Sequence, residues 1–590
     1  MQRSVCEAVL LLLLAGWLTG HLLAPGAGCA HEAASLILLA VAGTLAEKNA
    51  AGAPFLRAYR QRPGATAGIN LGVLALPALY GARILGDGAK GWDGLAFWTA
   101  IATGAGAVAS VLFTRKRGGQ DIGLVCASIA CCALWGGASI GASGLQGAVQ
   151  LGLPLVLLAG ASLCAWQAIM RRFPRSFTAG EALLAAQGCT LVAGAVALRT
   201  AVWLDLPWLP LGVLWRGRQK LDATDQRATW TPLVPTDVDA VACIIQGLLV
   251  ALLLLALIYS ALKPALASQP HKPAPFPSDI KTTSPNGTTG SHESHASRPI
   301  KPAEQRDTKE PPSSGQVFAF YALLAVAVAG AAPLWVCTVG GLPRHPAVWI
   351  LQHVARAPGW RLGLCCYWLL LLLAALAAVP RLAALPALPA ILVRKAYHVL
   401  AVAMFTPALL HQPLFLRLAF GGALVCFVLL EIIRVHRIPP LAEPLHQFLQ
   451  RFTDVRDSGP LILSHFSLLL GCALPLWLAP SSGGPSLASF AGVLSIGVGD
   501  TLASMVGVKY GRTRLCADSK KTVEGTVASF LGMLAGLLAL QWASTSMEIK
   551  AYDVFATLMA SLLEAFTVQS DNAFVPIMYA ALLLPRKLPK

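Results

Sequence analysis

The chain has 590 residues, of which 56% are hydrophobic and only 12% are charged, and its formal net charge at pH 7 is +17. A water-soluble protein has too little interior to hold that much apolar side chain, so the composition excludes a soluble globular protein and places most of the chain in lipid. The positive charge does not indicate nucleic-acid binding, because the basic residues stand between apolar runs and do not line one hydrophilic face. We expect them to anchor loops and to bind phosphate.

Apolar runs recur along the whole chain. A transmembrane segment takes about 20 apolar residues, and it is helical because lipid offers the backbone no hydrogen-bond partner. We expect spans at 5–24, 33–47, 66–85, 92–114, 121–142, 145–169, 178–204, 240–262, 317–339, 362–384, 396–411, 413–433, 459–479, 486–508, 523–543, 553–569 and 573–584. Several runs are short or contain proline, so the predicted fold class is an all-α, polytopic integral membrane protein with about 15–17 transmembrane helices.

One long hydrophilic stretch divides the chain into three regions. Residues 1–262 form an N-terminal multi-span membrane region that is nearly devoid of charge inside its apolar runs. Residues 263–316, which are rich in Pro, Ser, Thr, Lys and His, are predicted to be a disordered cytosolic linker. Residues 317–590 form a second multi-span region, and we expect the chemistry there because it carries the polar clusters.

The segment 496–526, IGVGDTLASMVGVKYGRTRLCADSKKTVEGT, combines two unusual features. Asp500 lies inside an apolar helix, where a carboxylate is costly and is functional by default. The loop that follows is basic, is punctuated by glycine and contains Lys520 and Lys521. Such a loop offers close backbone approach, free N–H groups and positive charge to a polyphosphate. The segment therefore predicts a membrane enzyme that handles a nucleotide at the membrane surface.

Further polar clusters interrupt the C-terminal region. They comprise Arg394, Lys395 and His398; Glu431 and Arg434; Asp457 and His465; and Asp571 and Asn572. Each has a structural alternative: Arg394 and Lys395 can anchor a helix at the lipid interface, Glu431 and Arg434 can form an ion pair, and either histidine can serve helix packing. Even numbers of expected spans separate the clusters, so all emerge on one side. The excess of Lys and Arg on that side predicts that it faces the cytosol.

Several sequence blocks resemble the dolichol kinase family of polyprenol kinases. They are VGDTLASMVG, KYGRTRLCADSKKTVEGT, LLEAFTVQSDNAFVP, RKAYH, LLEIIRVHRIPPL and RDSGPLILSHFSLLLG. The resemblance implies a CTP-dependent kinase of the endoplasmic reticulum membrane that phosphorylates dolichol and releases CDP. Its product, dolichyl phosphate, would be the lipid carrier for protein N-glycosylation, mannosylation and GPI-anchor synthesis. The CTP-binding loop of the family corresponds here to about 509–526.

The same loop supplies the candidate CTP ligands. They are Gly507, Lys509, Gly511, Arg512, Arg514, Lys520, Lys521, Thr522, Glu524 and Gly525. The basic side chains would hold the triphosphate and the glycines would let the backbone approach it. Thr522 and the amides that open the next helix would cap phosphate oxygens. The alternative for Glu524 is that its carboxylate only stabilises the start of the next helix and has no role in catalysis.

Asp500 and Lys521 are the catalytic candidates. Asp500 would either bind the expected cofactor, Mg²⁺ or another divalent cation, or accept the proton of the dolichol hydroxyl; the sequence does not separate these roles. Asp571 and Asn572 would complete the metal or cytidine site. Dolichol would arrive laterally from the bilayer, as its long polyisoprene chain requires.

Two other functions remain open from the sequence. A CTP:phosphatidate cytidylyltransferase would also bind CTP and Mg²⁺ beside lipid, but the RKAYH and EIIRVHRIPPL blocks favour the kinase. A transporter would also have many spans and an intramembrane aspartate. The gathering of the polar clusters on one face disfavours the transporter.

Overall fold

The computed structural model of the protein describes residues 3–585, apart from 25–27, 88–90, 114–121, 141–144, 205–235, 267–311, 385–388, 451–456, 458, 480–485, 518 and 545–546. Most of the expected linker lies outside the described residues. Within them the protein is all-helical, and the one β-type pairing joins Arg514 and Thr522. The predicted all-α class is confirmed.

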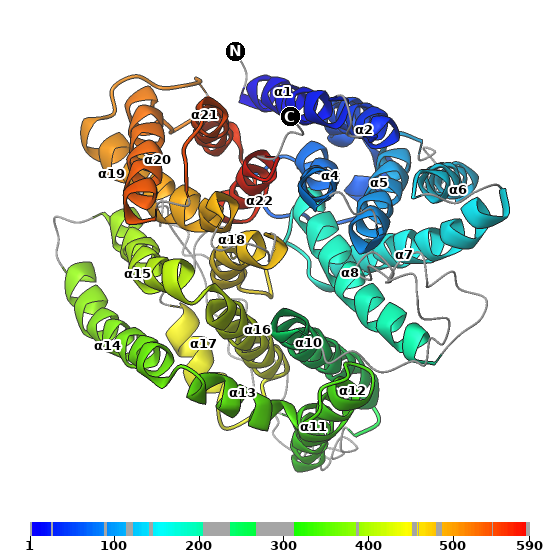
Figure 1. Ribbon diagram of the computed structural model, residues 1–590, viewed down its shortest axis with the longest axis vertical. Helices are drawn as coiled ribbons and strands as arrows, with labels where there is room; N and C mark the ends of the chain where they lie inside the picture. The colour runs from blue at the N-terminus through cyan, green and yellow to red at the C-terminus, as the bar shows by residue number, and fades with distance from the viewer. Residues whose placement is uncertain are drawn as a thin grey trace, which may run out of the picture.

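The N-terminal region is a bundle of apolar helices (Figure 1). Its helices are α1 (Arg3–Leu22), α2 (Ala30–Ala50), the short α3 (Pro54–Arg57), α4 (Ile69–Asp87), α5 (Gly91–Leu112), α6 (Ile122–Ser139), α7 (Leu145–Arg172) and α8 (Ala179–Trp203). The next helix, α10 (Asp237–Leu262), precedes the linker but packs against helices that follow it, α12 and α16.

The first helix of the C-terminal region begins at Ser314, three residues before the expected start of that region. Its helices are α11 (Ser314–Ala325), which a π-helical turn joins to α12 (Ala332–Thr338), α13 (Pro346–Ala355), α14 (Pro358–Ala383), α15 (Ala390–His411), α16 (Pro413–His436), α17 (Ala442–Gln450), α18 (Ser464–Leu478), α19 (Thr501–Tyr510), α20 (Val523–Ala543), α21 (Ala551–Phe566) and α22 (Asp571–Leu583). A second π-helical segment, Val493–Asp500, leads directly into α19.

Each expected span coincides with a helical element, and among the described residues 11 helices are long and apolar enough to cross a membrane. Three more apolar helices are shorter: Ile69–Leu85, Ser464–Leu478 and Asp571–Leu583. The remaining expected spans correspond to α15, α19 and α21, which are shorter or more polar. The chain is therefore a polytopic membrane protein.

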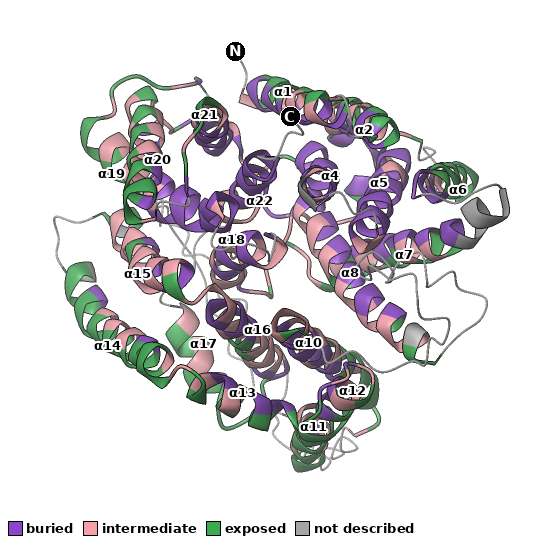
Figure 2. Cartoon of the chain, in the orientation of Figure 1, coloured by how far each residue is buried: buried purple, intermediate pink, exposed green. Residues whose placement is uncertain are grey.

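The two regions share one hydrophobic core. Helix α22 lies between them and packs against α4 of the N-terminal region and against α18 and α21 of its own region. Helices α22, α4 and α5 are largely buried, whereas α14 at the edge of the molecule is mostly exposed (Figure 2). The exposed leucines of α14, among them Leu370 and Leu376, have the orientation expected of side chains that contact lipid.

Small residues allow the central helices to approach closely. A Cβ on Gly471 of α18 would lie 2.1 Å from the main-chain oxygen of Asn572 in α22. A Cβ on Gly72 of α4 would lie 2.6 Å from Cα of Gly180 in α8. Close backbone approach at glycine is the usual way in which helices pack within a membrane, where dispersion contacts replace the hydrophobic effect.

Candidate functional site

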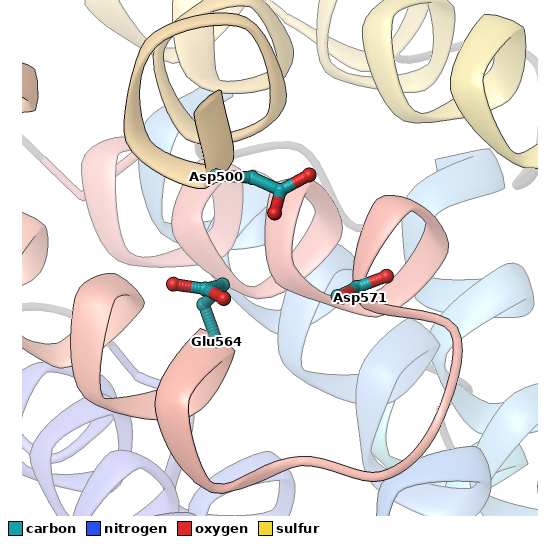
Figure 3. Close-up of side chains that lie close together, drawn as sticks. All are labelled: Asp500, Glu564 and Asp571. Atoms are coloured by element: carbon teal, nitrogen blue, oxygen red, sulfur yellow. The ribbon is translucent and has the colours of Figure 1, made fainter. Parts of the chain in front are cut away.

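Three carboxylates from separate elements meet inside the bundle. Asp500 ends the second π-helical segment, Glu564 lies in the last turn of α21, and Asp571 is the first residue of α22. One oxygen from each lies within 4.8 Å of the others. Figure 3 shows the three side chains gathered around a common space. We call this group the acidic cluster.

Two lysines offset part of the charge of the three carboxylates in the acidic cluster. The Lys395 ammonium donates a hydrogen bond to Oδ2 of Asp500. The Lys521 ammonium lies 2.6 Å from Oε1 of Glu564, donates also to the main-chain oxygen of Glu564, and lies 4.0 Å from Oδ2 of Asp571. Breaking a buried pair by removing one partner costs about 3–5 kcal/mol, so each lysine holds a carboxylate that would otherwise be strongly unfavourable here.

His398 adds a third group beside Asp500. It lies on the same face of α15 as Lys395, three residues further on, and its Nδ1 is 3.1 Å from Oδ2 of Asp500. His398 is buried. The structure thus places this histidine beside the acidic cluster, although the sequence also allowed a role in helix packing.

The π-helical segment brings Asp500 between α15 and α20. A Cβ on Gly497 would lie 2.3 Å from Cγ2 of Val402 in α15, and a Cβ on Gly499 would lie 3.0 Å from Sδ of Met533 in α20. Both glycines therefore allow the segment to lie close to its neighbours. Irregular turns of this kind are frequent at functional sites because they redirect one side chain within a helix.

The basic loop after α19 is folded back on itself. The Val523 amide donates to the Thr513 oxygen (2.9 Å), and the Leu515 amide donates to the Lys521 oxygen (3.1 Å). Glu524 accepts from the Thr513 amide at 3.0 Å, so this carboxylate stabilises the loop at the start of α20. The hydroxyl of Thr522 accepts from the Gly525 amide at 3.2 Å and thereby caps α20.

The basic side chains of this loop divide into two groups. Lys509, Arg512, Arg514 and Lys520 are exposed, whereas Lys521 is half-buried and turns toward the acidic cluster. Lys509 also lies over the ring of Tyr510, 5.1 Å from its centroid. The loop therefore presents positive charge to solvent next to a buried group of carboxylates.

The three candidate glycines pack α19 against α20. A Cβ on Gly507 would lie 3.2 Å from Oγ1 of Thr522, and a Cβ on Gly525 would lie 2.7 Å from the Ala503 oxygen. A Cβ on Gly511 would lie 2.7 Å from Cγ2 of Thr522, the residue that caps α20. The structure gives these glycines a packing role, and their expected contact with phosphate stays a prediction.

The remaining candidates lie away from the acidic cluster or at its border. Glu431 and Arg434 form the ion pair that the sequence allowed, with N–O distances of 2.8 and 2.6 Å. Arg434 also donates to the Pro460 oxygen, and Glu431 accepts from the Ile462 amide at 3.0 Å. This pair therefore fixes the chain that leads into α18.

Asp457 has a similar structural role. It accepts from the Leu463 amide at 3.0 Å and from the Ser464 hydroxyl at 2.6 Å, which caps the start of α18. His465 packs edge-on against Phe427, with ring centroids 6.4 Å apart. Asn572 follows Asp571 in α22, and Arg394 is half-buried next to Lys395.

Glu564 is not among the residues predicted from the sequence. The residue lies within the block LLEAFTVQSDNAFVP, which was matched as a whole. The available signal was the same as for Asp500: a carboxylate within an otherwise apolar helix. Its position seven residues before Asp571 did not indicate that both would meet Asp500, because that contact depends on how the helices pack.

Comparisons with known proteins agree with the sequence blocks. The family model for dolichol kinase matches residues 313–482, a match that ends before Asp500. The Arabidopsis thaliana protein named dolichol kinase EVAN is 34% identical over 592 aligned residues, which cover 93% of each chain.

Two further relatives match a smaller part of the chain. The Homo sapiens dolichol kinase is 35% identical over 259 residues, or 41% of this chain and 48% of that protein. The Schizosaccharomyces pombe dolichol kinase sec59 is 36% identical over 197 residues, or 32% of this chain and 39% of that protein. No solved structure matches the chain. Because the Arabidopsis relative aligns with nearly the whole chain, the protein belongs to the dolichol kinase family.

Proposed function

We propose that this protein transfers the γ-phosphoryl group of CTP to the terminal hydroxyl of dolichol, which gives dolichyl phosphate and CDP. The observation that supports this most is the acidic cluster, paired with Lys395 and Lys521 and adjoining an exposed basic loop. Phosphoryl transfer depends mainly on positioning and on neutralising charge around the transferred group. Carboxylates for a cation, beside ammonium groups for phosphate, meet both needs.

The acidic cluster fits a divalent cation. Mg²⁺ holds oxygen ligands at about 2.0–2.1 Å, so ligands on opposite sides of the ion lie about 4.2 Å apart. Ligands on adjacent corners of the octahedron lie about 3.0 Å apart. The three carboxylate oxygens lie within 4.8 Å of one another, so they would draw closer by side-chain rotation when the ion binds. We therefore assign Asp500, Glu564 and Asp571 as the residues that hold the cation, which in the bound state would neutralise charge on the phosphoryl oxygens.

The two lysines would exchange partners when the nucleotide binds. Lys521 extends from the basic loop and neutralises Glu564. With a cation held by the carboxylates, the Lys521 ammonium would be available to contact the triphosphate. Lys395 neutralises Asp500 in the same way that Lys521 neutralises Glu564. The exposed Arg512, Arg514 and Lys520 would attract and orient the triphosphate from solvent.

The location of the acidic cluster favours an enzyme over a transporter. Glu564 lies at the end of one helix and Asp571 at the start of the next, so the cluster adjoins a loop. Helix ends are expected near the membrane boundary, where a water-soluble nucleotide and a lipid alcohol can meet. We infer that this boundary is the cytosolic face of the endoplasmic reticulum membrane, from the distribution of basic loop residues and the family resemblance.

The test uses the purified full-length protein with dolichol and CTP labelled at either the γ or the α phosphate. A kinase moves only the γ label into lipid, whereas a cytidylyltransferase moves the α label. ATP as alternative donor and phytol as alternative acceptor establish selectivity. Transfer of the γ label to dolichol supports the proposal, and α-label transfer or no transfer to any lipid contradicts it.

A further inference from the structure

We propose that the N-terminal region positions the acidic cluster, through the buried Gln569 and Thr178 and the partly buried Glu181. This inference rests on the proposed cation-binding role of Glu564 and Asp571. These two residues are joined by the loop Thr567–Ser570, so the conformation of that loop sets the separation of their carboxylates.

Side chains of the N-terminal region make several hydrogen bonds to this loop. The side-chain Nε2 of Gln569 donates to the main-chain oxygen (3.2 Å) and to the hydroxyl (3.0 Å) of Thr66. The Thr178 hydroxyl donates to the amide oxygen of Gln569 at 2.6 Å. Glu181 accepts from the Ser570 amide at 2.8 Å. Every polar atom of the Gln569 side chain thus points to a residue far away in sequence.

A second set of contacts fixes the α21 end of the loop. Thr567 donates from its hydroxyl to Glu7 of α1 at 3.1 Å. Arg3 donates to the main-chain oxygens of Phe566 (2.8 Å) and Thr567. The first helix of the chain therefore contacts the C-terminal end of α21, the helix that carries Glu564.

The N-terminal partners are themselves rigidly placed. Thr178 and Glu181 form a capping box at the start of α8, because the Thr178 hydroxyl accepts from the Glu181 amide (3.2 Å) and the Glu181 carboxylate accepts from the Thr178 amide (2.9 Å). Arg62 pairs with Glu181 at 2.6 Å. The same two side chains also bond to the loop at 567–570: the Thr178 hydroxyl donates to Gln569, and the Glu181 carboxylate accepts from the Ser570 amide.

Burial shows that this arrangement is closely packed. Gln569 and Thr178 are both 0% exposed. Gly68, at φ +70°, leaves the space that Gln569 fills, and a Cβ there would lie 2.4 Å from the Gln569 amide. Buried polar groups keep their geometry when every hydrogen bond is made, and they lose it when one partner is removed. Groups hydrogen-bonded directly to metal ligands change metal affinity about 10- to 100-fold when they are replaced, and Gln569 acts on Glu564 and Asp571 through the loop that joins them.

The test compares Gln569→Met with a matched control, Gln187→Met. Gln187 is also buried and donates to the Ala100 oxygen at 3.3 Å, but it lies within α8 away from the loop. Mn²⁺ binding to the purified full-length protein, followed by electron paramagnetic resonance, reports the acidic cluster without depending on turnover. We expect Gln569→Met to weaken Mn²⁺ binding at least about tenfold, and Gln187→Met to leave it unchanged.

A second pair of variants keeps the inference testable if Gln569→Met does not fold. Thr178→Val removes the hydroxyl that donates to Gln569, whereas Thr178→Ser keeps it, so only the valine variant is expected to weaken Mn²⁺ binding. Equal Mn²⁺ affinity in the wild type, Gln569→Met and Thr178→Val would overturn the inference, as would the absence of Mn²⁺ binding by the wild type. If the wild type binds Mn²⁺ but does not phosphorylate dolichol, the proposed function fails while the positioning role stands.

Discussion

Replacing Glu564 by Gln is the sharpest perturbation of the acidic cluster. Glutamine keeps the size of the side chain and an oxygen that can accept from Lys521, but it removes the negative charge. The Lys521 ammonium now lies 2.6 Å from Glu564 Oε1, a charge-assisted contact in a side chain that is only 7% exposed. Hydrogen bonds to charged groups contribute about 1.5–3 kcal/mol.

That range sets the expected loss of activity. In the proposed transition state the Glu564 carboxylate contacts the cation instead of Lys521. If a charge-assisted contact of similar strength is lost there, turnover falls about 10- to 150-fold, since each 1.36 kcal/mol corresponds to a factor of ten. The assay is the initial rate of γ-label transfer from CTP to dolichol by purified protein at saturating CTP. The divalent-cation concentration for half-maximal rate should also rise, because a charged ligand becomes neutral.

The matched control is Asp553→Asn on the same helix. Asp553 is buried at the other end of α21, where it accepts from the Lys550 amide at 2.9 Å and caps the helix. Asparagine keeps that acceptor, so rate and cation dependence should stay at wild-type values. A wild-type rate and cation dependence in Glu564→Gln would refute the assignment of this residue to the cation site.

Other substitutions separate roles in the reaction from roles in the fold. Asp500→Ala should abolish dolichol labelling in microsomes when the rate is expressed per amount of protein present; retained activity rules out the proposed role. Lys521→Ala should raise the apparent KM for CTP, because it removes a charge near the triphosphate, and an unchanged KM would contradict the loop assignment. Gly525→Ala should lower the free energy of unfolding by about 1–3 kcal/mol, since the new Cβ would meet the Ala503 oxygen at 2.7 Å; thermal denaturation showing full stability would exclude this packing role. Asp457→Ala should cost about 0.5–2 kcal/mol of stability through the lost cap, and a changed cation dependence would instead tie Asp457 to the acidic cluster.

The sequence predicted the fold class because apolar runs leave few alternatives in lipid. Asp500 and Lys521 were also predictable, since a carboxylate in an apolar helix and a basic loop beside it are both local features. Lys395 was only a candidate, because a basic residue at a helix end can equally be an interfacial anchor. Its contact with Asp500 is a property of helix packing and not of local sequence.

The glycines have two uses that local sequence does not separate. A Gly-rich loop beside lysines is typical of phosphate binding, but Gly507 and Gly525 lie between α19 and α20, where a side chain would collide with a neighbour. Both uses require the same absence of a Cβ, so composition does not separate them. The T-x-x-E pattern of Thr178 and Glu181 is visible in the sequence as a capping box, yet nothing local indicates that it contacts Gln569 and Ser570.

The central claim is that the acidic cluster holds the divalent cation on which phosphoryl transfer to dolichol depends. The most direct measurement is the rate of γ-label transfer by purified protein that has been treated with a chelator and then titrated with Mg²⁺. We predict no transfer in the presence of chelator, and saturable recovery that needs more Mg²⁺ in Glu564→Gln than in the wild type. Transfer at an undiminished rate in chelator would contradict the account.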